Sequence, residues 1–290
     1  MPELPEVEGV VRALAPVASG RTIRRVAISE TVIRSKEAGK EAIVKGMPVG
    51  QFTSQLAGWT IDSIERRSKY IYIHLSREAS CRLLVSHLGM TGAWFAVGSV
   101  EDIREQKFRN HIHAVFEMED GGLLVYSDIR RFGELRLLTC AEDHPSLLEM
   151  APEPFDDEAE SFFIHKAETP AFRKKAIKEV IMDGRVISGC GNIYATEALF
   201  RTGIHPKRTA GRISEARKRQ LFREIAAVLR ESIDAGGSSI SDYRNINGEA
   251  GSMQDRLQMY GRKTCPVCGA QTAAVQIAGR TSTYCKKCQH

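Results

Sequence analysis

The sequence has no run of about 18 apolar residues, the length that a membrane-spanning helix requires. Its first ten residues, MPELPEVEGV, carry acidic side chains where a secretion signal has positive charge followed by an apolar stretch. Internal repeats are also absent. We therefore expect a globular protein that stays in the cytoplasm.

The seven cysteines do not suggest a disulfide framework, because a chain without a secretion signal stays in a reducing compartment. Cys81, Cys140 and Cys190 stand singly in apolar or glycine-rich surroundings, and we expect them to be small buried hydrophobic residues. The other four form two CxxC pairs sixteen residues apart, a spacing that matches the closed tetrahedral site of structural zinc. The predicted ligands of one structural Zn²⁺ are Cys265, Cys268, Cys285 and Cys288.

Charge is distributed unevenly along the 290 residues, which are enough for two domains and a small appendage. Residues 141–170 hold nine acids and one lysine, and we interpret them as a solvated boundary between domains. Residues 171–220 hold twelve basic side chains against four acids, and 261–290 hold five and no acid. A cationic half of this kind is typical of a polyanion-binding protein, although a merely solvated basic face is the alternative.

Hydrophobic periodicity changes from a β pattern to a helical pattern along the chain. Apolar spacing over 5–15 predicts a short amphipathic helix with Pro5 in its first turn. Residues 22–138 are rich in short β-branched and aromatic runs, and the turn sequence at 120–122 predicts a hairpin, so this half should form an antiparallel sandwich or barrel. The clearest predicted strands are 70–75, 83–88, 111–118 and 123–128.

The second half is predicted to be mainly helical. Apolar positions from Leu221 to Ile233 share one helical face, with Ser214 as a candidate cap and Gly236 at the end. Residues 238–256 are polar and aperiodic, which indicates a functional or mobile loop.

The sequence resembles the formamidopyrimidine-DNA glycosylase (Fpg) family in several motifs, which occur in the family's order and extend over nearly the whole chain. They are MPELPEVE at the start, RRSKYIYIHL (66–75), HLGMTG (87–92), DIRRFG (128–133), PEPF (152–155), GCGNIYATEALF (189–200), GIHP (203–206), YGRK (260–263) and the CxxC ribbon.

The resemblance implies an α+β chain in which an N-terminal helix and antiparallel β-sandwich precede a helix-two-turn-helix domain and a C-terminal zinc ribbon. A damaged base in double-stranded DNA would be held between the two halves by a monomeric, nucleoid-associated enzyme. The expected domains are a catalytic sandwich domain (1–140), an acidic linker (141–170), the DNA-binding helical domain (171–260) and the ribbon (261–290).

An exposed α-amine has a pKa of about 7.7 to 8.0, so Pro2 would be partly neutral and nucleophilic once Met1 is removed. A proline at this position carries little weight by itself. The resemblance implies that Pro2 forms a Schiff base with the sugar and that Glu3 is the acid or base beside it. It implies that Lys69 lies against the lesion phosphate and assists β-elimination, and that Arg280 in the ribbon assists δ-elimination.

Removing a base from the stack leaves a void that other groups must fill. The resemblance implies that Met90 fills it, that Phe132 wedges between neighbouring pairs, and that Arg130 pairs with the widowed base. Without the resemblance, Met90 and Phe132 would be assigned to the core. Further DNA contacts implied in the same way are His111 on a hairpin, Arg173 and Lys178 on one helix, and Asn192 in GCGNIYA.

The expected activity is that of a DNA-formamidopyrimidine glycosylase with AP lyase activity, acting on oxidised purines such as 8-oxoguanine. The 238–256 loop resembles the family segment that closes over the flipped base and favours purine lesions. Two alternatives stay open: an Nei-type enzyme for oxidised pyrimidines, and a non-catalytic DNA-binding protein.

Two departures from the family pattern affect these expectations. Ile129 replaces a frequent proline, so the backbone that aims Arg130 and Phe132 should be less constrained. Only Thr264 separates YGRK from Cys265, which should alter how Arg280 is presented.

Overall fold

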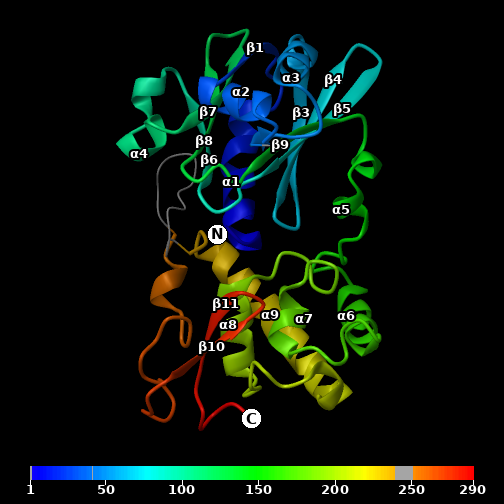
Figure 1. Cartoon of the computed structure of the whole chain (residues 1–290), viewed down its shortest axis with the longest axis vertical. Coiled ribbons are helices and arrows are strands. Elements are labelled where there is room, and N and C mark those ends of the chain that lie inside the picture. The colour runs from blue at the N-terminus through cyan, green and yellow to red at the C-terminus, as the bar shows by residue number, and fades with distance from the viewer. Residues whose placement is uncertain (1, 41, 239–250) are drawn as a thin grey trace. The chain divides into compact units, whose positions relative to one another are not determined.

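The computed structural model describes residues 2–40, 42–238 and 251–290, and the chain separates into two compact units (Figure 1). The first unit comprises Met1–Leu148 with Gly236–Gly251, and the second comprises Glu149–Ala235 with Ser252–His290. Within the described ranges, no helix has both the length and the apolar character needed to cross a lipid bilayer. The α+β class is confirmed.

The first unit contains the two sheets of a sandwich, as the short β-branched and aromatic runs predict. One sheet has the strand order β1-β7-β8-β6, and the other has the order β2-β9-β5-β4-β3 with a parallel β2–β9 pair. All four predicted strands fall on observed strands, and the turn at 120–122 joins β7 to β8. The strands are β1 (Ile23–Ile28), β2 (Ile43–Val44), β3 (Thr60–Arg67), β4 (Tyr70–Arg77), β5 (Ser80–His87), β6 (Gly92–Val97), β7 (Ile112–Met118), β8 (Leu123–Asp128) and β9 (Glu134–Leu138). The helices of this unit are α1 (Leu4–Ala18), α2 (Glu30–Glu37), α3 (Val49–Leu56), α4 (Gln106–Arg109) and α5 (Pro145–Leu148).

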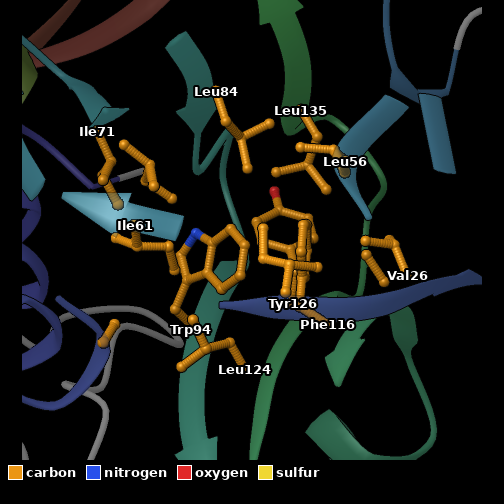
Figure 2. Close-up of a cluster of buried hydrophobic side chains, with 14 of the residues drawn as sticks. Val26, Leu56, Ile61, Ile71, Leu84, Trp94, Phe116, Leu124, Tyr126 and Leu135 are labelled. Atoms are coloured by element: carbon orange, nitrogen blue, oxygen red, sulfur yellow. The ribbon is translucent and has the colours of Figure 1, made fainter. Parts of the chain in front are cut away.

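The core of this unit lies between the two sheets (Figure 2). Trp94, Phe116 and Tyr126 of the four-stranded sheet meet Ile71 and Leu84 of the five-stranded sheet, and none of these residues is more than 1 % exposed. The indole of Trp94 lies 5.4 Å from the ring of Phe116 and 5.3 Å from that of Tyr126. Burial of each such side chain is worth about 1.5 to 3 kcal/mol, so the sandwich is a stable support for the loops at its edge.

Helix α1 confirms the predicted amphipathic helix and continues it by three residues. Its apolar face, with Val7, Val10 and Leu14 at most 1 % exposed, packs against β3 and β6. Pro5 lies in the first turn, where the N–H that it lacks has no helical partner. The packing therefore fixes the N-terminal end of the chain to the sandwich.

The second unit is mainly helical and ends in a two-stranded hairpin. The long helix α9 confirms the helix predicted after Ser214, which occupies the N-cap position but makes no side-chain capping bond. The elements are α6 (Ala159–Glu168), α7 (Ile177–Met182), α8 (Asn192–Arg201), α9 (Glu215–Asp234), β10 (Ala273–Ile277) and β11 (Arg280–Tyr284).

The acidic segment 141–170 is divided between the units and is not a separate linker. Its second half contains α6, whose Phe163 is fully buried and stacks on Phe222 of α9 at 5.8 Å. Glu160 of α6 accepts hydrogen bonds from Arg219 and Arg223 of α9. The acidic side chains of α6 thus pair with basic ones on α9 while its apolar face is buried, which charge counting alone did not reveal.

The expectation for the three single cysteines is correct for one of them. Cys190 is buried, whereas Cys81 and Cys140 are exposed. Cys81 lies near the hairpin end of β5, and Cys140 follows β9 as the cap of a short 3₁₀ turn. An apolar neighbourhood in sequence therefore did not imply burial at these two positions.

Candidate functional site

The N-terminus of α1 carries the residues predicted to act on the sugar. Pro2 and Glu3 are both buried, and Glu3 is the N-cap of the helix. The backbone N–H of Glu3 donates to Glu6 Oε2 at 2.8 Å, and Glu6 Oε1 accepts from the backbone N–H of Ser238 at 2.7 Å. The Glu6 carboxylate therefore joins the start of α1 to the start of the 238–256 segment. Residues 239–250 of that segment, predicted to close over a flipped base, lie outside the described residues.

Lys69 lies in the two-residue turn between β3 and β4. The other turn residue, Ser68, is buried and has a φ of 56°, a conformation that costs a non-glycine residue about 1 to 2 kcal/mol. Arg66 Nη1 donates to the Ser68 carbonyl at 3.0 Å and so stabilises this conformation. Burial, and then the positive charge of Lys69, lower the pKa of His87 to about 4. Lys69 is thus close to His87 at the end of β5.

The structure brings Met90, Arg130 and Phe132 onto two adjacent loops. Met90 is half-buried in the β5–β6 turn, while Arg130 and Phe132 are exposed in the β8–β9 loop, Phe132 by 60 %. The Arg130 guanidinium lies 4.8 Å from the centre of the Phe132 ring. Gly89, at φ 57°, packs so closely on the second loop that a Cβ there would lie 2.5 Å from the carbonyl carbon of Phe132. Phe132 is therefore not a core residue, and its backbone is held beside that of Met90.

A buried carboxylate shapes the loop that carries Arg130 and Phe132. Asp128 Oδ1 accepts from Thr91 Oγ1 at 2.5 Å and from the Arg130 N–H at 3.2 Å, and Oδ2 accepts from the Gly133 N–H at 2.7 Å. The Arg130 N–H also reaches Thr91 Oγ1 at 2.9 Å. Ile129 packs against the apolar cluster around Phe95 and Phe108. The backbone before Arg130 was expected to be less constrained because Ile129 replaces a proline. These hydrogen bonds and the packing of Ile129 supply the constraint instead.

Two histidines lie next to these loops. His87, which sequence reasoning did not single out, accepts the Gly89 N–H on Nδ1 at 3.1 Å, so it constrains the turn that bears Met90. Its position in the HLGMTG motif is the signal that could have identified it. His111 lies in the turn before β7, not within the strand, and its Nδ1 bonds to the Lys107 carbonyl at 2.7 Å. The carbonyl of His111 accepts the Asp128 N–H at 3.0 Å, which links it to the same loop.

In the second unit, the structure brings Asn192 and the Arg280 hairpin together. Asn192 is the first residue of α8, and its Nδ2 donates to the Thr281 carbonyl of β11 at 3.1 Å. Arg280 is exposed at the tip of the β10–β11 hairpin. An exposed guanidinium beside a helix N-terminus is a suitable arrangement for binding phosphate.

Arg173 and Lys178 differ in position from each other. Arg173 is exposed in a turn before α7, not on the helix as predicted. Lys178 is on α7 but fully buried, with Nζ donating to Thr196 Oγ1 of α8 at 2.5 Å. DNA contact by Lys178 stays a prediction, and its hydrogen bond indicates a role in joining α7 to α8.

Glu197 is a structural residue of the same unit that sequence reasoning missed. Its fully buried carboxylate accepts three backbone N–H groups, from Gln258 at 2.7 Å, Met259 at 2.9 Å and Tyr260 at 2.7 Å. It therefore holds the segment that leads into the YGRK motif against α8. A charged residue within GCGNIYATEALF, otherwise apolar on that side, was the available signal.

The four C-terminal cysteines converge as predicted. Their Sγ atoms all lie within 4.8 Å of one another. Zn–S bonds of about 2.3 Å in a tetrahedron place sulfur atoms about 3.8 Å apart, so these residues fit one structural zinc. The backbone N–H of Cys285 donates to Gln289 Oε1, and Gln289 Nε2 donates to the Ile204 carbonyl, which ties the metal site to the helical part of the unit. The bridge between Thr264 and Gln271 shows that the short linker enters the ribbon directly.

Comparison with known proteins agrees with this arrangement along the whole chain. Residues 1–135 match the formamidopyrimidine-DNA glycosylase N-terminal domain, residues 150–244 match the formamidopyrimidine-DNA glycosylase H2TH domain, and residues 262–290 match the zinc finger found in FPG and IleRS. The formamidopyrimidine-DNA glycosylase of Bacillus licheniformis is 37 % identical over all of this chain and 99 % of its own. That of Heliobacterium modesticaldum is 38 % identical over the full length of both chains.

Solved structures show the same likeness. A Lactococcus lactis Fpg variant in complex with Fapy-dG containing DNA has a TM-score of 0.84 and 32 % identity over 99 % of both chains. The complex of Lactococcus lactis Fpg with abasic-site DNA has a TM-score of 0.83 and 31 % identity over the full length of both. The chain belongs to the formamidopyrimidine-DNA glycosylase family.

Proposed function

We propose that this DNA repair glycosylase excises oxidised purines and then cleaves the abasic strand through a Schiff base on Pro2. Glycosylase function in DNA repair follows from its family. The observation that carries the rest of the proposal is the exposed Phe132–Arg130 pair beside Met90, held by the buried Asp128. An exposed phenylalanine next to a guanidinium contributes little to the stability of the folded protein. Both side chains can instead insert into a stack of DNA bases.

Pro2 supplies the nucleophile in this proposal. After Met1 is removed, its secondary amine attacks C1′ of the damaged nucleotide and loses its proton, while the bond from C1′ to the base breaks and the base leaves with a proton. Protonation of O4′ then opens the sugar ring at the C1′–O4′ bond and leaves a C1′=N⁺ iminium on Pro2. The resulting iminium withdraws electrons, so loss of a C2′ proton expels the 3′ phosphate, and a second elimination expels the 5′ phosphate. Glu3, buried beside Pro2 as the helix cap, exchanges the protons of the first step.

Cationic side chains would hold the phosphates during these eliminations. Lys69 at the β3–β4 turn supports the first, and Arg280 of the ribbon supports the second. The four cysteines would hold a zinc ion whose contribution is structural, since four thiolates leave no position for water. Double-stranded DNA with a damaged base is the proposed partner of a monomer located with the nucleoid.

Oxidised pyrimidines are the rival substrate class. Lactococcus lactis Fpg itself has been crystallised with an oxidized pyrimidine containing DNA. Excision rates on matched 8-oxoguanine and thymine-glycol duplexes separate the two, and a clear preference for thymine glycol would contradict the purine assignment.

Borohydride trapping tests the chemistry. Incubation with abasic-site or 8-oxoguanine DNA and borohydride should give a covalent protein–DNA adduct, and peptide mapping should place the adduct on Pro2. The Pro2→Gly variant, which presents a primary amine in place of the secondary amine of proline, should react more slowly. Intact mass must show that Met1 is absent. A chain that binds DNA but gives no adduct would be a non-catalytic binder, and an active enzyme that retains Met1 would exclude Pro2 as the nucleophile.

A further inference from the structure

Arg66 connects helix α1 with the turn that carries Lys69. Its Nε donates to Glu8 Oε2 at 2.8 Å, and its Nη1 donates to the Ser68 carbonyl at 3.0 Å. Glu8 lies on α1, the helix whose first residues follow Pro2 and Glu3. A single planar guanidinium thus fixes the relative position of two segments that are about 60 residues apart in sequence.

This bridge is shielded from water. The Arg66 side chain is 8 % exposed and that of Glu8 is 19 % exposed. Burial alone would raise the pKa of the Glu8 carboxyl, but hydrogen bonds from Arg66 and Arg12 outweigh it and hold the pKa below its usual value. Glu8 is therefore ionised at neutral pH. Arg12, in contrast, binds the other Glu8 oxygen from a surface position that is 62 % exposed.

The turn needs such support because Ser68 has a left-handed backbone conformation without being glycine. The bond from Arg66 satisfies the carbonyl of that residue, directly before Lys69. Movement of Ser68 would redirect the Lys69 side chain. A displacement of about 1 Å at a reacting group can lower a rate by about 100-fold.

We propose that Arg66 and Glu8 are positioning residues for the elimination step, which they support by fixing the Ser68–Lys69 turn relative to the helix that begins beside Pro2. The inference rests on the proposed function, because it takes Lys69 to assist β-elimination. Neither Arg66 nor Glu8 needs to touch the DNA for this role.

Two conservative variants test it. Arg66→Lys keeps the charge but cannot donate to Glu8 and Ser68 with the geometry of the guanidinium fork, and Glu8→Gln keeps the shape but loses the charge. Each should slow strand cleavage at a preformed abasic site by about 10- to 100-fold under single-turnover conditions. The dissociation constant for uncleavable tetrahydrofuran DNA should change by less than about twofold. Arg12→Gln is the matched control, because it removes the exposed bond to Glu8 and leaves the turn intact, and its rate should be unchanged.

A double-mutant cycle with Lys69→Ala separates positioning from general stabilisation. If Arg66 and Glu8 act through Lys69, their substitutions should have little further effect on the cleavage rate in the Lys69→Ala background. Equal rate losses in both backgrounds, or unchanged cleavage by both single variants, would overturn the inference. Unfolding midpoints identify a misfolded variant, and Glu8→Gln carries the test if Arg66→Lys does not fold.

Failure of the proposed function has a different signature. If Lys69→Ala itself cleaves at the normal rate, the role assigned to Lys69 is wrong. If wild-type protein forms no borohydride adduct, the Schiff base is wrong. If the adduct forms and Lys69→Ala is slow, but the Arg66 and Glu8 variants are fast, only the positioning inference is wrong.

Discussion

Replacing Gly89 by alanine should weaken the contact that holds the Phe132 loop. The added Cβ would lie 2.5 Å from the carbonyl carbon of Phe132 and 2.6 Å from the nitrogen of Gly133. Carbon atoms pack at about 3.5 to 4.0 Å, so the loops must separate by about 1 Å. The 2.7 Å bond from the Gly133 N–H to Asp128 would then be lost, at about 1.5 to 3 kcal/mol.

The backbone conformation of Gly89 adds a second cost. Its φ of 57° costs alanine about 1 to 2 kcal/mol. Gly121 is a matched control in the same unit, because its φ is 88° and a Cβ there meets nothing within 4 Å. Gly89→Ala should therefore lower the free energy of unfolding by about 2.5 to 5 kcal/mol, and Gly121→Ala by about 1 to 2 kcal/mol.

Urea unfolding of both variants measures the difference, and single-turnover kinetics measure its consequence. Excision of 8-oxoguanine should be impaired more than cleavage at a preformed abasic site, because only the intact base has to be extruded past Phe132. Equal stability losses in the two variants would refute the argument that the close contact between the loops matters.

Three further predictions concern other parts of the chain. Glu197→Gln replaces one carboxylate oxygen by an amide group that faces backbone donors, so it should lower the free energy of unfolding by about 3 kcal/mol, as measured by urea titration. The pKa of His87 is about 4 in the folded protein against 6.5 as its ordinary value, so the unfolded chain binds the proton first. Stability should fall by up to about 3 kcal/mol as the pH drops from 6.5 to 4, and His87→Asn should abolish this part of the pH dependence; an unchanged profile would contradict the assignment. Cys285→Ser should reduce bound zinc from one per chain to none and increase hydrogen exchange over 273–284, because a two-stranded hairpin is marginal without its metal. Retained zinc at full stoichiometry would refute the four-thiolate site.

Local patterns in the sequence were sufficient for two of the helices, four of the strands of the sandwich and the metal site. Short runs of β-branched and aromatic residues identified β4, β5, β7 and β8, helical spacing identified α1 and α9, and the CxxC spacing identified the zinc ligands. These features depend on residues close in sequence. The relative positions of such residues follow from the repeat of side-chain directions along a helix or a strand. The catalytic and DNA-contact residues were found only through the family resemblance, since Pro2 or Lys69 alone has no distinguishing pattern.

The tertiary structure decided how those residues are held. Gly89 against Phe132, Thr91 on Asp128, and Arg66 on Glu8 join positions about 40 to 60 residues apart, and no local rule specifies such pairs. The same reason explains why α6 lies within the second unit despite its acidic composition. Composition and the spacing of apolar residues determine which helices and strands form. The orientation of a loop depends instead on the buried groups that contact it from distant parts of the chain.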